Sequence, residues 1–535
     1  MTESTFKKLS YALFGALAIF ILLTFKQYGI SNDENVQHVY GQLLLKFYGS
    51  GFTDQSAFTY KNLYLYGGFF DLIAASLERI LHLWVWDIRH LLSAIFGFIG
   101  IVAVYKTTKE LAGERAAFLA IVLLSLTGAW AGAMFTHTKD ISFGACMAWA
   151  MYYTVLIARH LPRVPLSLSI KLGVAIGFAL GLRIGGAFAV IYLLLLVFVG
   201  AYLQANTLKQ KLDYCLKSSI ALIPAGVTAF CLMVLFWPWA IMGFDHILIA
   251  AKSFSHFAFN MDTLVNGKFV SIGEISRTYL FQYLSIRLPE TFLIGIACIF
   301  LWVIIRLKRI KLANHLPALS VAITVLFPLA FVLYDRPALY NGVRHFTFVI
   351  PPLAVVAGIG LSQAWDTLNQ YKKTQIVLGV LVAILTINTL TTLYKLRPYE
   401  YIYYNHFAGS NFKEAEHKWE SDYWSSSLIE TTQMLEDYLD KEEAKAPTKD
   451  RKEHYLVAVC AEAFQADAYF DERLSVTEDW VVADFFISGT NMNCDKVLQG
   501  KMVGTVERLG ATLAVVKDRR QLVGEDRRPR AAPRD

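Results

Sequence analysis

Long apolar stretches alternate with short polar segments through the first three quarters of the chain. A helix of roughly 15 to 20 apolar residues is long enough to cross a hydrocarbon core of about 30 Å. The pattern predicts about eleven such helices. They lie near residues 11–26, 91–105, 116–134, 141–158, 168–182, 187–203, 218–240, 291–305, 315–334, 346–363 and 375–394.

The composition agrees with this pattern. Of the 535 residues, 55% are apolar and only 17% are charged, which excludes an ordinary soluble globular protein. The first apolar stretch follows Lys7 and Lys8, but no small-residue cleavage site comes after it. We therefore expect this stretch to be a retained membrane anchor and not a signal peptide.

Lysine and arginine residues gather in alternate loops, and short loops rich in these residues stay in the cytoplasm. With a cytoplasmic N-terminus, the short loops on the opposite face contain only Lys139, Arg183, Arg336 and Arg344. We therefore expect a multi-pass protein of the inner (plasma) membrane, with its C-terminal region on the exported, periplasmic side. The net charge of +7 follows from the cytoplasmic loops and predicts no nucleic-acid partner.

The composition changes at residue 395 to a charged, mixed pattern. The stretch "SSSLIETTQMLEDYLDKEE" predicts a helix, and "HYLVAVC", "DWVVADFFIS" and "ATLAVVKD" predict strands. The fold class is therefore an α-helical polytopic membrane protein with a small C-terminal α+β exported domain. We expect a transmembrane domain over 1–394, with a first exported loop at 27–90, and a second domain over 395–535 that is disordered from about residue 524.

Two further features concern the exported side. In the first loop, "YGGFFDLIAASLERILHLWVW" has the spacing of an amphipathic helix that lies in the membrane interface. Residues 244–290 predict an interfacial helix followed by a loop. Of the six cysteines, Cys460 and Cys494 lie in the exported region, where an oxidising compartment permits a disulfide, and the sequence leaves their pairing open.

Polar residues concentrate in the loops that we assign to the exported face. Charged groups at membrane depth are costly, so a cluster of them on one face is typical of an active site at the interface. Ionisable groups of a secondary transporter would instead lie near the bilayer midplane. The candidates are Asp33, Glu34, His137, Lys139, Asp140, Arg183, Tyr340, Asn341, Arg344 and His345.

Most of these positions also have a structural interpretation. The pair Asp33 and Glu34 fits a solvated end of a membrane span, and Lys139 and Asp140 fit an ion pair at a helix start. The tyrosines of "YEYIYY" fit an aromatic belt. Arg183, between glycines in "GLRIGG", has fewer such alternatives, because a guanidinium can hold a phosphate through two parallel hydrogen bonds.

Five motifs occur in a characteristic order. They are the carboxylate pair in the first exported loop, "KD", "R-x-G-G", "YNGxRHF" and "YNxxAG…DYW". In this order they resemble the bacterial relatives of the protein O-mannosyltransferases, which are polyprenyl-phosphate-sugar-dependent glycosyltransferases of the GT-C fold in the glycosyltransferase family 39 group. The resemblance extends from Asp33 to Trp424, and the last hundred residues contain none of its motifs.

The resemblance implies an inverting transfer of a hexose or pentose from a polyprenyl phosphate to a lipid, glycan or protein acceptor on the exported face. It implies that Asp33 is the general base and that Glu34 supports it. Stabilisation of the phosphate falls to cationic groups. The donor site is expected to contain Lys139, Asp140, Arg183, Arg344, His345, Tyr340, Asn341 and His137.

Two questions stay open at this point. We assign no metal site, but Asp33, Glu34, His137 and Asp140 offer oxygen and nitrogen ligands, so a divalent cation remains an alternative. A secondary transporter, or a transferase that moves a non-sugar group from the same lipid carrier, is the alternative function.

Overall fold

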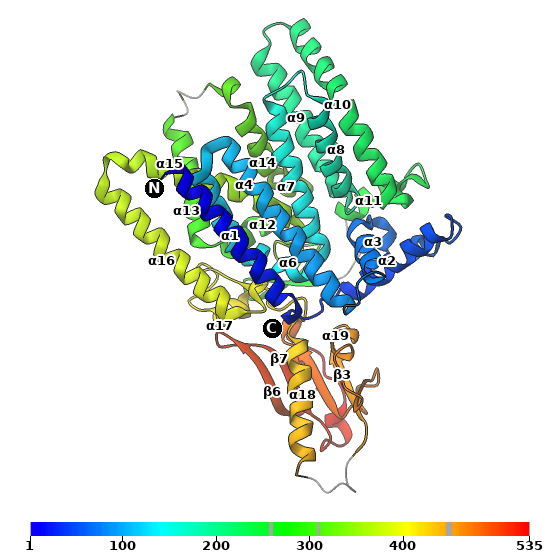
Figure 1. Ribbon diagram of the computed structural model, residues 1–535. Coiled ribbons are helices and arrows are strands. Elements are labelled where there is room, and N and C mark those ends of the chain that lie inside the picture. The colour runs from blue at the N-terminus through cyan, green and yellow to red at the C-terminus, as the bar shows by residue number, and fades with distance from the viewer. Residues whose placement is uncertain (1, 256–260, 307, 309–310, 446–451, 534–535) are drawn as a thin grey trace. The chain divides into compact units, whose positions relative to one another are not determined.

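The computed structural model describes residues 2–255, 261–306, 308, 311–445 and 452–533. The chain divides into two compact units (Figure 1). The helical unit comprises Met1–Lys26, Val36–Phe259 and Ile275–Thr391. The sheet unit comprises Gln27–Asn35, Asn260–Glu274 and Thr392–Asp535, so it takes two short segments from the first part of the chain as well as the C-terminal region.

The chain up to residue 396 is mostly helical, as the apolar pattern predicts. The α-helices are α1 (Glu3–Thr24), α2 (Glu34–Gly49), α3 (Phe69–Glu78), α4 (Val85–Ser125), α5 (Gly128–Ala131), α6 (Ala133–Thr136), α7 (Thr138–Ala158), α8 (Leu166–Leu180), α9 (Ala187–Gln204), α10 (Leu208–Phe236), α11 (His246–Ser255), α12 (Tyr279–Arg287), α13 (Glu290–Arg306), α14 (Leu316–Asp335), α15 (Ile350–Thr367) and α16 (Lys372–Leu396). The predicted helix and loop at 244–290 become α11 and a short hairpin, and residues 256–260 lie outside the described residues.

Eight helices in the described part of the chain are long and apolar enough to cross a membrane, or nine if the bent pair α12 and α13 forms one span. This confirms the predicted fold class, with a different count of spans. α8 has only 15 residues, and α4, with 41 residues, contains the predicted span 91–105 and the first part of the predicted span 116–134. The rest of the second span continues into α5 and α6.

Gly113 divides α4 into two helices. Its φ of 81° and ψ of −176° lie in a region that glycine adopts and side chains with a Cβ avoid. The predicted cytoplasmic loop between the second and third spans is therefore helical almost throughout, and the change of direction is confined to one residue.

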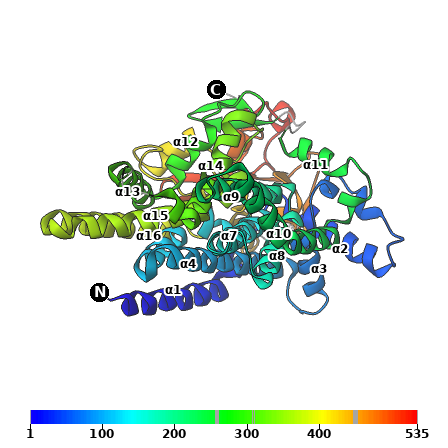
Figure 2. The same cartoon turned by 90° about the horizontal axis from the view of Figure 1, so that it is seen from above.

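α7 and α15 form the centre of the helical unit. In the apolar window of α7, 78% of residues are buried, and in that of Arg344–Gln370, which contains α15, 83% are buried. The corresponding shares for α1 and α16 are 22% and 11%, and Figure 2 shows these two helices at the periphery. Polar groups at the beginning of α7 and α15 are therefore surrounded by protein.

The sheet unit contains a five-stranded mixed sheet in the order β4-β3-β5-β7-β6. β3 pairs in parallel with β4 and β5, whereas β7 pairs antiparallel with β5 and β6. The strands are β3 (Tyr455–Cys460), β4 (Leu474–Val476), β5 (Phe485–Gly489), β6 (Lys501–Arg508) and β7 (Ala511–Asp518). β4 has only three residues, and in β6 only Val506 is buried, so both strands have weak apolar patterns and the sequence does not predict them.

Three helices and a hairpin complete this unit. They are α17 (Phe412–Lys418), α18 (Leu428–Glu443), α19 (Phe464–Asp467), and the antiparallel strands β1 (Asp262–Val265) and β2 (Lys268–Ser271). α18 packs against β5, β6 and β7. Cys460, at the end of β3, forms a disulfide with Cys494, which follows β5. The two cysteines that the sequence left open are thus paired.

The C-terminal tail makes contacts in this unit, although the sequence predicts disorder from about residue 524. Arg527 donates hydrogen bonds to the carbonyl oxygens of Val481 and Ala483, at 2.7 and 2.9 Å. Asn493 donates to the carbonyl of Pro533 at 2.7 Å. These backbone acceptors order the described part of a segment whose composition is typical of disorder, and residues 534–535 lie outside the described residues.

The tyrosines of "YEYIYY" are buried in the sheet unit and do not form an aromatic belt. Tyr401 donates a hydrogen bond to Asp422, and Tyr404 donates to the carbonyl of Glu420 at 2.7 Å. Asp422 also accepts from the amides of Ser426 and Ser427, at 3.0 and 2.9 Å. With these donors, Asp422 organises the turn before α18.

Glu400 provides a pH-dependent test of this packing. Burial raises the pKa of its carboxyl to about 7, against a weaker opposing effect of the hydrogen bond from Tyr28. The unfolded chain ionises near pH 4.3, so the folded state holds the proton more tightly and loses stability as the pH rises from about 4.5 through 7. Glu400→Gln should therefore raise the unfolding temperature at pH 8 and leave it unchanged at pH 4.5.

Thermal unfolding of the purified full chain at both pH values measures this effect. Glu453→Gln, at an exposed carboxylate, is the matched control and should change neither temperature. A lower unfolding temperature of Glu400→Gln at pH 8 would contradict the burial argument.

Candidate active site

Asp140 is the centre of a buried ionic cluster in the helical unit. It lies in the first turn of α7, where the helix dipole favours a carboxylate. Only 3% of the residue is exposed. One carboxylate oxygen pairs with Arg183, and the other accepts a hydrogen bond from Nε of Arg344 at 3.1 Å. One carboxylate therefore joins two arginines that are distant from each other in the sequence.

Local backbone geometry places both arginines. Arg183 is extended and precedes the short 3-10 helix Ile184–Gly186, in which a Cβ on Gly186 would lie 2.6 Å from the backbone nitrogen of Leu180. The "R-x-G-G" turn therefore needs a glycine where the chain folds back onto α8. Arg344 begins the 3-10 helix before α15, directly after a turn with positive φ at Asn341 and Gly342.

Aromatic rings flank the cations of this cluster. The Tyr66 ring lies 4.4 Å from Nζ of Lys139 and 6.0 Å from Cζ of Arg183. The Tyr340 ring lies 5.8 Å from Cζ of Arg344 and packs edge-on against the His345 ring, with centroids 4.6 Å apart. These are distances at which a ring face attracts a cation.

The structure thus brings most of the predicted donor-site residues together. Lys139, Asp140, Arg183 and Arg344 form the cluster, and Tyr340 and His345 adjoin it. Of the other predicted residues, His137 precedes α7 and is within electrostatic range of Asp140, and Asn341 forms the turn before Arg344. The sequence did not indicate Tyr66, which also belongs to the cluster.

The carboxylate pair of the first loop belongs to the sheet unit. Glu34 begins α2, and its Oε2 accepts a hydrogen bond from the backbone amide of Ser31 at 2.7 Å. This bond is a helix-start contact, so Glu34 has a structural task. Asp33 is half-buried in the turn before the helix, and its role as base stays a prediction.

A second buried network lies in the helical unit and was not predicted. Arg89 donates hydrogen bonds to Asp71 at 2.9 Å and to Gln37 at 3.1 Å, and Thr138 donates to the same Gln37 oxygen at 2.7 Å. The network joins α2, α3 and α4 to the first residue of α7. Asp71 therefore faces protein rather than the membrane interface. The feature of the sequence that could have indicated this network is Arg89, a charged residue at the start of an apolar span.

The cavities near the two ends of α7 differ in volume. Next to Arg183, a cavity of about 10 Å³ is lined by Tyr66, Ile184 and Ser253 among others, and has room for about one water. Nε of Arg183 is buried and has no hydrogen-bond partner among the described residues. This guanidinium therefore retains a donor that faces protein and not bulk solvent.

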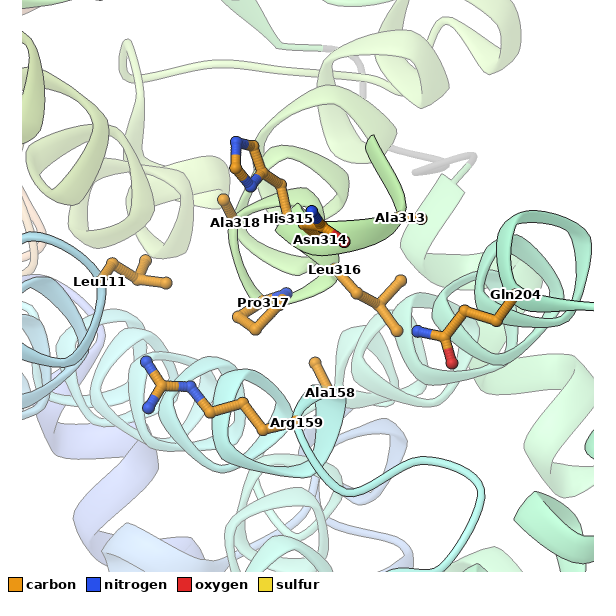
Figure 3. A pocket seen from close by; sticks show the side chains of 10 residues that line it. All are labelled: Leu111, Ala158, Arg159, Gln204, Ala313, Asn314, His315, Leu316, Pro317 and Ala318. Atoms are coloured by element: carbon orange, nitrogen blue, oxygen red, sulfur yellow. The ribbon is translucent and has the colours of Figure 1, made fainter. Parts of the chain in front are cut away.

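A larger cavity of about 410 Å³ lies at the other end of α7, roughly 30 Å away along the helix. Figure 3 shows its lining, which includes Arg159, Gln204 and the start of α14. Arg159 is engaged there in an ion pair with Glu110. The cavity contains none of the predicted site residues, so size alone does not identify the site.

Metal-ligating side chains do not cluster in the part of the chain that the structure describes. No group of three or more His, Cys, Asp or Glu residues lies close enough there to hold a metal ion.

Replacement of Asp140 tests the ionic cluster. Removing one partner of a buried ion pair leaves an uncompensated charge, which typically costs about 3–5 kcal/mol. Asp140→Ala should therefore strongly lower the unfolding temperature of the purified chain. Asp366, which pairs with Arg115 and has a side chain 57% exposed, is the control, because an exposed pair contributes only about 0–1 kcal/mol. Equal effects of Asp140→Ala and Asp366→Ala would contradict the buried cluster.

Residues 70–239 match the family described as dolichyl-phosphate-mannose-protein mannosyltransferase. This range includes Lys139, Asp140 and Arg183. A comparison with curated proteins gives no match.

Three solved structures match the chain at low sequence identity. ArnT from Cupriavidus metallidurans, bound to undecaprenyl phosphate, has 14% identity and a TM-score of 0.48, with 95% of this chain and 97% of that chain covered. The apo oligosaccharyltransferase of Archaeoglobus fulgidus has 13% identity and a TM-score of 0.49, with 90% and 71% covered. The arabinofuranosyltransferase AftD from Mycobacteria has 12% identity and a TM-score of 0.40, with 85% and 35% covered.

The family match agrees with the motifs "KD" and "R-x-G-G", both of which lie inside the matched range. The match confirms the resemblance drawn from the sequence: residues 70–239 are similar to the dolichyl-phosphate-mannose-protein mannosyltransferase family.

Proposed function

We propose that the protein is an inverting glycosyltransferase that moves a hexose or pentose from a polyprenyl phosphate to a lipid, glycan or protein acceptor. In this proposal it spans the plasma membrane, with a cytoplasmic N-terminus and with the sheet unit on the exported side. The observation that supports it best is the buried cluster in which Arg183 and Arg344 share Asp140 beside Lys139.

The chemistry of the cluster suits a phosphate. Guanidinium groups bind phosphate oxygens through charge-assisted hydrogen bonds, which are stronger than neutral ones. Asp140 fixes both arginines in place, and Arg183 keeps a buried Nε donor without a partner among the described residues. Donors that are held in position before the reaction stabilise the negative charge that develops on a leaving phosphate.

The reaction needs one base and one leaving group. The acceptor hydroxyl oxygen forms a bond to the anomeric carbon while the bond from that carbon to the phosphate oxygen breaks. Asp33 takes the hydroxyl proton, and the lipid phosphate leaves with the electron pair of the broken bond. Attack from the face opposite the phosphate inverts the anomeric configuration. The matched family is named after the donor dolichyl-phosphate mannose, which is a mannose linked to a polyprenyl phosphate. This name supports the proposed class of donor.

Asp33→Asn tests the base. General-base catalysis contributes about 10²–10⁴-fold, so the variant should lose at least a hundredfold in turnover while it still binds the donor. The measurement is release of polyprenyl phosphate by purified protein from a polyprenyl-phosphate sugar, in the presence of an envelope extract as acceptor. Asp54→Asn, at another carboxylate of the first loop that pairs with Lys46, should keep full activity. Normal turnover of Asp33→Asn would remove Asp33 from this role.

Arg183→Ala tests the phosphate site. Loss of a charge-assisted bond to the phosphate should raise the donor KM or lower kcat at least tenfold, because such bonds contribute about 1.5–3 kcal/mol. The matched control is Arg115→Ala, which removes an arginine that is also paired with an aspartate and is bonded to Ser362. The same assay should show little change for this variant. If both substitutions weaken donor use equally, the phosphate assignment is wrong.

A further inference from the structure

The segment Gln27–Asn35, which contains Asp33, makes contacts along its length with other parts of the sheet unit. Arg397 donates to the side chain of Gln27 at 2.7 Å, and Tyr28 donates to Glu400 at 3.2 Å. The contacts of Gly29, Ile30 and Asn32 described below also have their partners beyond residue 392. The base proposed above therefore lies on a segment whose partners come from the C-terminal region.

Gly29 allows the closest of these contacts. A Cβ at this position would lie 2.1 Å from the carbonyl oxygen of Ser426. No side chain fits at that distance, so the backbone of Gly29 lies directly against the turn that Asp422 organises.

Ile30 is held on both of its backbone groups. Its amide donates to the hydroxyl of Tyr469 at 3.1 Å, and its carbonyl accepts from Nε2 of Gln465 at 2.6 Å. The same nitrogen of Gln465 donates to the carbonyl of Trp424 at 2.8 Å. Asn32, the residue before Asp33, donates to the carbonyl of Tyr423 at 3.5 Å.

Gln465 is itself rigidly placed. It is 1% exposed and lies on α19, which begins four residues after the end of β3. β3 pairs on both sides, with β4 and β5, and the disulfide of Cys460 and Cys494 fixes its last residue. A site held on such regular elements is more precise than one held on loops alone.

We propose that Gln465 and Tyr469 are positioning residues, which hold the backbone of Ile30 and thereby fix the carboxylate of Asp33 for its reaction with the acceptor hydroxyl. This inference rests on the proposed function of Asp33. It assigns a task to Gln465 and Tyr469, which lie outside the matched range 70–239 and beyond Trp424, where the last motif of the sequence resemblance ends.

The inference also explains the segment "SDYWSSS". The backbone carbonyls of Tyr423 and Ser426 lie against Asn32 and Gly29, and the carbonyl of Trp424 accepts from Gln465. Asp422 holds this turn in shape. A displacement of about 1 Å at a reacting group costs as much as a hundredfold in rate. Loss of these contacts should therefore appear in kcat rather than in binding of the donor.

Two substitutions test the proposal, and the second removes more hydrogen bonds than the first. Tyr469→Phe removes one hydroxyl from a half-buried ring, and Gln465→Leu removes the amide that bridges two carbonyls. Tyr438→Phe is the control, because it removes a hydroxyl of the same unit that bonds Glu442 and Asp518. All variants are made in the full chain.

The first measurement is hydrogen exchange of the peptide that contains residues 27–35, followed by mass spectrometry. Exchange at this peptide should be at least tenfold faster in Tyr469→Phe and in Gln465→Leu, and unchanged in Tyr438→Phe. Unchanged exchange in Tyr469→Phe would overturn the contact itself. This readout does not depend on catalysis, so it stands even if Asp33→Asn retains turnover and the proposed base is wrong.

The second measurement is the transfer assay. We expect kcat to fall about tenfold in Tyr469→Phe and more in Gln465→Leu, with the donor KM within twofold of the unmodified protein. If Gln465→Leu fails to fold, Tyr469→Phe alone decides. Faster exchange at residues 27–35 together with an unchanged kcat in Tyr469→Phe would overturn the positioning role.

Discussion

Two arginines share one buried carboxylate at the beginning of α7, and the arrangement of the helical unit depends on this interaction. An isolated charge in such surroundings is very costly, so Arg183, Arg344 and Asp140 are tolerated only together. Arg183 comes from the turn between α8 and α9, and Arg344 precedes α15. The ion pairs therefore tie three distant parts of the chain to one point at the end of the most buried helices.

The residues proposed for the reaction are divided between the two compact units. The cations are presented by helix starts and turns of the helical unit, and the base is presented by a segment of the sheet unit. Different forces hold each set. In the helical unit, charge is balanced by charge among apolar helices. In the sheet unit, backbone amides and carbonyls of an extended segment are bonded to side chains of a small folded domain, as at Ile30.

The sequence predicted the features that depend on local pattern. The apolar runs predicted the helices, and the motifs predicted the residues that cluster around Asp140. The assignment of the polar loops to one membrane face stays a prediction. Features that depend on distant partners were not accessible. Asp71 lies in what looked like an interfacial helix but pairs with Arg89 of α4, and the buried tyrosines after residue 398 looked like a membrane belt. The single residue at which α4 breaks, Gly113, was hidden inside a longer charged loop.

The contact between Gln465 and Ile30 joins residues 435 positions apart. Ribosomes add about 5–20 residues per second, so the segment of Asp33 waits on the order of 20–90 s for its final partners. During this interval the ribosome synthesises α2 to α16. The contacts of Ile30 can thus form only after Gln465 and Tyr469 have been synthesised, and a chain truncated before these residues lacks them. Under the proposed function, such a chain would contain all the proposed phosphate-binding cations but would lack the contacts that hold the proposed base.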